Sequence, residues 1–403
     1  MGTSNKLWWC HFGVAICQKI YKVFFHTLIM RTMMKRIGAI LAAGVLLSSA
    51  SGRQSSLSLP LNDTLEAFLE DPLVHLEKQG LSRQDFQHNT IAAEHVRIAL
   101  SNLAEGCANV GISDPSRYQQ AKECVATALT VALDPLLSPY DVSVQTVTDF
   151  GDNGLYLSHL NIILGSWKSL THDDSYETLN QKITEHLAQQ TLQDSQKNIQ
   201  SYPSLNYKWP ADQTAVLYSL WLFDKNYGTD LGEKSIGEWT KYMDEKKTDK
   251  ETGLYVSEVT GYYPSADVPR GCALSWSIRY MAAFSPEKAA EQWDFYKQHF
   301  EQQYGLLAAF REWPISYSGF SDVDSGPILL DNGVAATAFA IGASRAVGDE
   351  STYAQLSRTE TATKFTAHAF AVVGNDEGRE IILIADSLLA SAIDLNMHTI
   401  TKQ

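Results

Sequence analysis

The segment GLYLSHLNIILGSWKSL, residues 154–170, decides how the rest of the chain is interpreted. Its apolar residues occur on every side of a helical projection rather than along one stripe. A helix without a polar face is buried on all sides in a folded protein. The next segment, residues 175–193, is amphipathic and charged, with one face for a core and one for water. The two segments together predict one inner and one outer helix.

The same alternation recurs along the chain. Apolar segments begin near residues 154, 211, 269 and 327, with a period of about 57 residues, and each is followed by an amphipathic segment. Extending this period to both ends predicts an all-α fold, an (α/α)6 toroid of inner and outer helices. An irregular helical domain is the alternative. The expected inner helices are residues 91–106, 154–170, 211–223, 270–284, 333–347 and 380–395, and the expected outer helices are residues 61–79, 118–133, 175–193, 232–246, 286–303 and 351–370.

Short strand signals stand near the starts of successive repeats. They are Gly-Leu-Tyr at residues 154–156 and 253–255, and Gly-Leu-Leu at residues 305–307. Their recurrence supports the period. We therefore expect short β-like segments around the mouth of the toroid.

The composition is that of a globular protein. The chain has 403 residues, of which 44% are hydrophobic and 19% charged, so it can bury an ample core. The formal net charge is -14, although residues 1–50 contain basic side chains and no acid. An acidic body repels the phosphates of nucleic acids and anionic membranes. We therefore expect no nucleic-acid partner.

The N-terminal region has the pattern of an export signal. Residues 34–36 (Met-Lys-Arg) precede an apolar run at 37–47, and residues 48–50 (Ser-Ser-Ala) follow it. This order is typical of a secretory signal cleaved near Ala50, and the run is short for a bilayer span. We expect a periplasmic or secreted protein. Its expected parts are a doubtful leader at residues 1–33, explained by an over-extended start codon or by a membrane-touching amphipathic arm, a signal peptide at 34–50 and a single toroid domain at 51–403.

The chain has five cysteines. Cys107 and Cys124 flank one short connection, and an exported protein could join them in a disulfide. Cys272 lies in an apolar helix, where a lone thiol is more often part of the core than a nucleophile. No spacing of histidines and cysteines points to a metal site, and we expect no cofactor.

Functional residues are expected where the inner helices begin. In a toroid these helix starts share one side, and their unpaired N–H groups and partial positive charge suit acids and oxygen-rich ligands. The richest entrance is the connection at residues 311–327, which contains acids, aromatic rings, glycines and prolines. A long connection of this kind is more often a binding loop than a spacer. The alternative is a solvated loop whose acids cap the next helix.

Acids at these entrances are the candidates for catalysis. Two carboxylates at a suitable separation can act as general acid and base on a C–O bond. Asp212 and Asp324 could instead cap helices. Glu312 could simply pair with Arg270 or Arg311. The candidate acids are Asp212, Glu312, Asp322 and Asp324.

A histidine and several aromatic and basic residues complete the candidate site. His159 lies among apolar residues near the start of an inner helix, where it would orient substrate or be a core histidine. Aromatic rings at a funnel suit a sugar, because its apolar faces stack on rings while its hydroxyl groups bond to carboxylates. Trp209 and Trp313 could instead belong to the core. The candidates for substrate binding are Tyr156, Tyr207, Trp209, Tyr263, Arg270, Arg311 and Trp313.

Short motifs scattered over roughly residues 150–350 carry a family resemblance. They are His-Leu-Asn at 159–161, Ser-Leu-Trp at 219–221 with the acids that follow to residue 230, and the Asp-rich loop leading into residues 333–349. In these motifs the chain resembles the linalool dehydratase/isomerase family. The resemblance implies an (α/α)6 fold, export, a ring-shaped homo-oligomer and cofactor-free dehydration of a terpene alcohol.

The catalytic residues of that family include cysteines and a histidine, and they carry over only in part. The histidine matches His159. One family cysteine falls about where this chain has Asp212, and nothing near Lys208 replaces the other. Cys272 lies on a different helix. Carboxylates therefore stand in place of the thiol acid/base pair.

The leading interpretation is an exported, cofactor-free enzyme that uses carboxylate acid/base chemistry on a small hydroxyl-rich or oligosaccharide substrate. It would be a glycosidase or a lyase. A hydro-lyase of the linalool dehydratase type is the second interpretation. A non-catalytic carbohydrate-binding toroid is the third.

Overall fold

The computed structural model describes residues 81–88, 90–140, 142–201, 207–262, 265–317, 319–322, 324–373 and 388–402, together with Glu70. The chain divides into two compact units. The larger unit, Leu57–Glu360 with Glu380–Gln403, contains the candidate site residues. The packing described below lies within it.

Helices dominate the described residues, and the all-α prediction is confirmed at that level. Among these helices, none is both long and apolar enough to cross a membrane. Two short antiparallel hairpins are present, β1 (Glu301–Tyr304) with β2 (Leu307–Phe310) and β3 (Ile328–Leu329) with β4 (Asn332–Gly333). In the described ranges the α-helices are α4 (Arg83–Gln87), α5 (Ile91–Ser113), α6 (Tyr118–Ala132), α7 (Gly154–Thr171), α8 (Glu177–Gln193), α9 (Pro210–Tyr227), α10 (Glu233–Lys246), α11 (Gly271–Phe284), α12 (Pro286–Phe300), α13 (Val334–Val347), α14 (Glu350–Val373) and α16 (Leu388–Thr399), and the short 3-10 helices are η1 (Pro115–Arg117) and η2 (Val144–Thr146).

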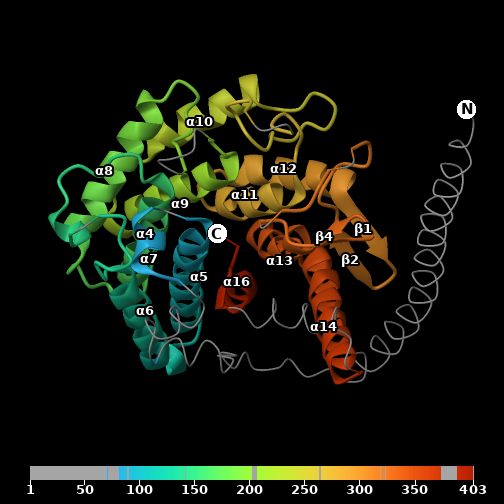
Figure 1. Cartoon of the computed structure of the whole chain (residues 1–403), viewed down its shortest axis with the longest axis horizontal. Helices are drawn as coiled ribbons and strands as arrows, with labels where there is room; N and C mark the ends of the chain where they lie inside the picture. The colour runs from blue at the N-terminus through green and yellow to red at the C-terminus, as the bar shows by residue number, and fades with distance from the viewer. Residues whose placement is uncertain are drawn as a thin grey trace, which may run out of the picture. The chain divides into compact units, whose positions relative to one another are not determined.

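The apolar helices pack one against the next. α5 packs against α7, α7 against α9, α9 against α11, α11 against α13 and α13 against α16, and α16 packs in turn against α5 (Figure 1). In α7 every residue from Gly154 to Ser166 is buried, as expected for a helix covered on all sides.

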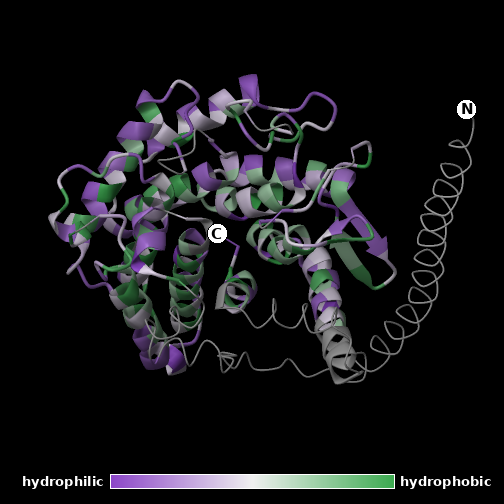
Figure 2. Cartoon of the chain, in the orientation of Figure 1, coloured by the Kyte–Doolittle hydropathy of each residue, from purple (hydrophilic) through white to green (hydrophobic). Residues whose placement is uncertain are grey.

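The charged helices have a different pattern of burial. In α10 the buried residues are Ser235, Trp239 and Met243, one per turn along a single face. α8, α10 and α12 lie on the outer side of α7, α9 and α11, and hydrophilic residues run along them (Figure 2). The segments predicted as inner helices are thus buried on all sides, whereas those predicted as outer helices are buried along one face.

Some boundaries differ from the expected ones. The helix expected at 286–303 ends at Phe300, because residues 301–304 pair with β2 through a turn at Gly305, whose φ of 71° suits glycine. Residues 154–156 are not strand-like but form the first turn of α7. The expected helix at 61–79, apart from Glu70, lies outside the described residues, as do residues 380–387.

The helix expected to end at Gly106 continues to Ser113. Gly106 does not terminate α5 but lets α16 approach it. A Cβ at Gly106 would lie 3.1 Å from Leu395 Cγ and 3.2 Å from the Asn396 Cα. Glycine in the middle of a helix is therefore a packing residue here and not a stop signal.

A disulfide joins Cys107 of α5 to Cys124 of α6, with their Cα atoms 6.3 Å apart and a sequence separation of 17. In the chain-entropy model, a loop of this size contributes about 3 kcal/mol. Replacing both cysteines with alanine is therefore expected to lower the free energy of unfolding by about that amount, measured by urea denaturation. Reductant should destabilise the wild type similarly and leave the double variant unchanged. Equal stability of the oxidised wild type and the double variant would contradict this expectation.

Candidate functional site

Arg270 fixes the long loop to the start of α11. Its Nε donates to Glu312 Oε1 at 2.6 Å, and its two terminal nitrogens donate to the Asp322 carboxylate at 2.7 Å each. Its guanidinium also lies over the Trp313 ring, 5.2 Å from the centroid. A planar guanidinium can bind two carboxylates and an aromatic face at once, which an ammonium group does less well. Arg270 thereby organises the 311–327 loop.

Two glycines allow this loop to lie close to the helices. The Gly271 N–H donates to the Glu312 carbonyl oxygen at 2.8 Å. A Cβ at Gly271 would lie 2.1 Å from the Arg311 carbonyl oxygen, so no side chain fits there. A Cβ at Gly333 would lie 2.5 Å from Glu312 Oε2. Both positions need glycine if Glu312 is to lie between α11 and α13.

Glu312 is fully buried and serves as a structural acid. Its Oε1 accepts from Arg270 and, at 3.1 Å, from the Cys272 thiol. Oε2 has no hydrogen-bond partner among the residues the structure describes. Burial raises the pKa of Glu312, although the positive charge and the hydrogen bond of Arg270 act to lower it. Burial and the Glu312 charge raise the pKa of the Cys272 thiol well above its usual value, so it donates a hydrogen bond and is not a thiolate.

Asp322 is occupied within its own turn. Its Oδ1 accepts the backbone N–H of Asp324 at 3.1 Å and that of Ser325 at 3.0 Å. Burial alone would raise the pKa of Asp322, but the hydrogen bonds from Arg270 and Ser325 outweigh it and lower the pKa. Asp322 is therefore an ionised partner of Arg270 and a poor proton donor.

Asp212 and Asp324 lie in different segments, and the charge of Asp324 acts on the pKa of Asp212. Asp212 is in the first turn of α9, partly buried, and the N-cap of that helix is Trp209. Asp324 is exposed, with Oδ1 3.4 Å from His95 Nε2. Burial raises the pKa of Asp212 to about 7. The Ser201 hydroxyl lowers this pKa, and the negative charge of Asp324 raises it further. The negative charge of Asp324 therefore disfavours ionisation of Asp212.

Glu94 also acts on Asp212, although it was not among the residues predicted from the sequence. It lies in the first turn of α5, is fully buried and forms an ion pair with Arg97. Burial raises the pKa of Glu94, and its charge contributes to the raised pKa of Asp212. Its Oε2 has no hydrogen-bond partner among the described residues. Glu94 lies in the first turn of an inner helix, as Asp212 does, and this position is the sequence signal that could have indicated it.

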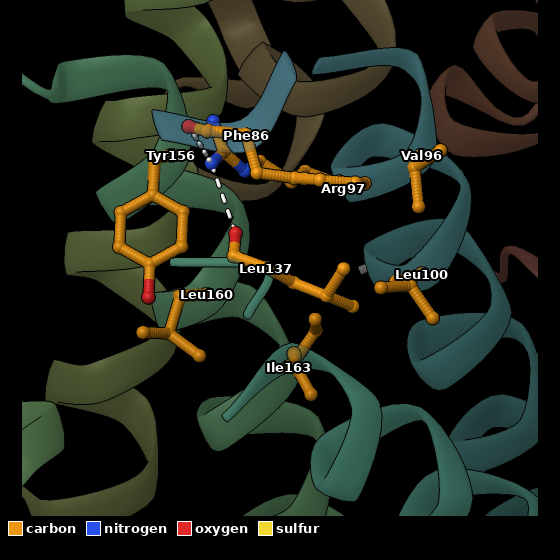
Figure 3. Close-up of a pocket in the computed structure, with 9 residues that line it drawn as sticks. Phe86, Val96, Arg97, Leu100, Leu137, Tyr156, Leu160 and Ile163 are labelled. Carbon is orange, nitrogen blue, oxygen red and sulfur yellow. Dashed lines mark hydrogen bonds between the residues drawn. The ribbon is translucent and has the colours of Figure 1, made fainter. Parts of the chain in front are cut away.

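His159 and Tyr156 lie inside the helix packing. His159 is buried in α7, with Nδ1 2.7 Å from Ser101 Oγ on α5. Burial, with the charges of Arg279 and Arg97, lowers the pKa of His159 to about 3, so its imidazole is neutral. The guanidinium carbon of Arg97 lies 4.6 Å from the centroid of the Tyr156 ring. Tyr156 also lines a small, mostly apolar cavity (Figure 3). The structure thus places both side chains in the core, which for His159 is the alternative that the sequence left open.

The remaining candidates are distributed around the entrances. The rings of Tyr207 and Trp209 lie 5.2 Å apart before α9, and both side chains are partly buried. Trp313 is buried, and its indole N–H donates to the Phe320 carbonyl oxygen at 3.1 Å. Arg311 is partly buried, and its Nε donates to the Trp313 carbonyl oxygen at 3.1 Å. Tyr263 lies outside the described residues.

Hydrogen bonds join the 311–327 loop to Arg270 at the start of α11, and His95 of α5 lies 3.4 Å from Asp324. The start of α9 is linked to them through the effect of Asp324 and Glu94 on the pKa of Asp212. Asp212 has the pKa of a proton donor at neutral pH, while Asp324 supplies an exposed carboxylate. Glu312, Asp322 and Arg270 support the loop that carries Asp324. No protein-family model matches this chain.

Proposed function

We propose that this protein is an enzyme that cleaves a C–O bond by carboxylate acid–base catalysis in a hydroxyl-bearing substrate, most simply a saccharide. The proposal rests on the place of Asp212 in the first turn of α9, where burial raises its pKa to about 7, together with the exposed carboxylate of Asp324. A carboxyl group of this kind is partly protonated at neutral pH and can donate, while an exposed carboxylate can accept. The reaction class is then that of a glycosidase or a lyase.

Aromatic residues support a saccharide as substrate. Tyr207 and Trp209 immediately precede the helix that carries Asp212, and their partly exposed rings are adjacent. Rings of this kind can stack on the apolar face of a sugar next to the carboxyl group that protonates it.

We also propose that the larger unit is an (α/α)6 toroid with this site at one mouth. The succession of helix contacts from α5 through α16 and back to α5 supports it. A further support is that Glu94, Asp212 and Cys272 all lie in the first turns of apolar helices. Inner helices of equal polarity would bring these first turns to one side.

A hydro-lyase acting on an alcohol is the second candidate, as the resemblance to the linalool dehydratase/isomerase family suggested. Cys272 favours it, because this thiol lies at the same entrance and is hydrogen-bonded to Glu312. A protonated thiol with a raised pKa could donate a proton to a leaving hydroxyl group.

A substrate screen separates these candidates. Purified wild type and Asp212→Asn are incubated with oligosaccharides and with terpene alcohols, and the products are analysed. Oligosaccharide cleavage that Asp212→Asn abolishes would support the leading proposal. Dehydration of an alcohol would favour the second candidate. Saccharide binding without turnover, unchanged in the variant, would overturn the enzymatic proposal and leave a binding toroid.

Export is part of the proposal. The Cys107–Cys124 disulfide supports it, because disulfides persist mainly in oxidising compartments. Expression with the native N-terminus is expected to give an exported protein that begins near Ser51, as read by N-terminal sequencing. A retained chain that still contains residues 34–50 would contradict this expectation.

A further inference from the structure

Polar side chains of α14 and α16 meet away from the candidate site. Tyr353 and Glu360 lie two turns apart on α14, and Asp394 and His398 lie at i, i+4 on α16, so each pair shares a helix face. His398 Nε2 lies 2.8 Å from Glu360 Oε2 and 3.7 Å from Asp394 Oδ1. One ligand atom from each of Glu360, Asp394 and His398 lies within 4.8 Å of the others.

We propose that Glu360, Asp394 and His398 form a binding site for a divalent transition-metal ion, for which Zn²⁺ is the probe. Zinc binds histidine nitrogen and carboxylate oxygen at about 2.0–2.2 Å, which places neighbouring ligand atoms on the order of 3–4 Å apart. The nitrogen–oxygen separations of 2.8 and 3.7 Å need only small adjustments to reach that geometry. Two carboxylates supply the charge that balances a divalent cation.

Tyr353 provides the outer contact that orients the imidazole. Its hydroxyl lies 3.0 Å from His398 Nδ1. An Nδ1–H that donates to this oxygen leaves the Nε2 lone pair for a metal, the arrangement usual for metal-binding histidines. Arg345 of α13 lies over the Tyr353 ring, 4.7 Å from its centroid, and its Nε donates to the Ile400 carbonyl oxygen at 2.6 Å. The outer contact is therefore itself supported from a third element.

The site is accessible to solvent. The side chains of His398, Glu360 and Asp394 are 18%, 22% and 28% exposed, so an ion can enter and keep a water ligand. Without an ion the same groups form an ion-pair cluster. Glu360 and Tyr353 then raise the pKa of His398 to about 9, against the effect of burial. A metal must displace that proton, as is general for histidine ligands.

The test is calorimetric titration of the EDTA-treated full chain with Zn²⁺ after removal of the chelator. The wild type is expected to bind one equivalent at this site. His398→Gln removes the nitrogen ligand and should weaken this binding by about 100-fold or more, and Tyr353→Phe by about 10-fold. His88→Gln, at an exposed histidine on the C-cap of α4, is the matched control and should bind like the wild type.

Either of two results would overturn the proposal: no stoichiometric binding by the wild type, or binding that His398→Gln leaves unchanged. If His398→Gln does not fold, the conservative Tyr353→Phe decides, and unchanged affinity in that variant would count against the site. Neither readout depends on the proposed enzymatic function.

Discussion

Asp212→Asn is expected to lower turnover by about two to four orders of magnitude, because a positioned proton donor contributes roughly that much to the rate. The amide keeps the shape of the carboxyl group but cannot transfer a proton. We expect kcat to fall while KM changes little, since the ground-state contacts remain. Asp324→Asn should lower turnover by a factor in the same range. The measurement is steady-state kinetics on the substrate that the screen identifies.

The same variant carries a stability signature that does not need a substrate. The folded-state pKa of Asp212, about 7, lies above the usual aspartate value of 3.8. The folded state therefore binds this proton more tightly than the unfolded state, and stability falls as pH rises from about 4 to 7. At pH 8, Asp212→Asn should be more stable than the wild type by roughly 4 kcal/mol, and near pH 4 by less than about 1 kcal/mol.

Asp230→Asn is the matched control for both readouts. Asp230 is exposed and lies beyond the other end of α9. Its substitution should leave kcat unchanged and shift the unfolding free energy by less than about 0.5 kcal/mol at either pH. Full activity of Asp212→Asn, or a stability difference that is the same at pH 4 and pH 8, would exclude Asp212 as the proton donor.

Arg270→Met is expected to destabilise the protein by about 3–5 kcal/mol. It removes the cation between Glu312, whose side chain is 0% exposed, and Asp322, leaving a buried carboxyl group without its ion partner. Loss of the bidentate contact with Asp322 should also free the loop that carries Asp324. Urea denaturation measures the first effect, and limited proteolysis within residues 311–327 measures the second.

A double variant separates charge from packing. Arg270→Met with Glu312→Gln removes both charges, so it should be less destabilised than Arg270→Met alone, with a coupling energy of about 0.5–3 kcal/mol. Arg270→Lys keeps the charge but lacks the two guanidinium N–H groups that bind Asp322 together. Its loss of unfolding free energy should therefore lie between those of the wild type and Arg270→Met. Additive effects of the two single substitutions would show that the ion pair does not carry the stability.

The helices could be predicted because their periodicity is strong. α7 and α11 are apolar on all sides, and their bounds fall within a residue of those expected. The helix at 286–303 was extended too far because Glu301 to Tyr304 have no sequence feature that excludes a helix, and only pairing with β2 makes them a strand. The helix at 91–106 was predicted too short, because the period alone does not fix where α5 ends and the packing of α16 against Gly106 is not visible in the local sequence.

The sequence could indicate which acids belong to the candidate site, but not which of them are buried and which are exposed. The rule that acids gather at inner-helix starts found Asp212, and the composition of the loop found Asp324. Nothing in the sequence distinguishes Glu312, buried and bonded to Arg270, from Asp324, which is exposed. That difference arises from burial, which depends on the glycines at 271 and 333. The Cys272 contact with Glu312 spans 40 residues, so local patterns could not indicate it.

The contact between α5 and α16 also has a consequence for the order of folding. Asn396 Nδ2 donates to Asn102 Oδ1 at 2.9 Å across 294 residues of sequence. A contact of such long range forms late, because the entropy of closing the intervening loop must be overcome first. During synthesis, α5 is complete long before α16 emerges, so the face around Gly106 lacks its final cover for most of that time. Because exposed apolar surface favours association of incomplete chains, we expect the growing chain to be prone to aggregation until the last helix has packed.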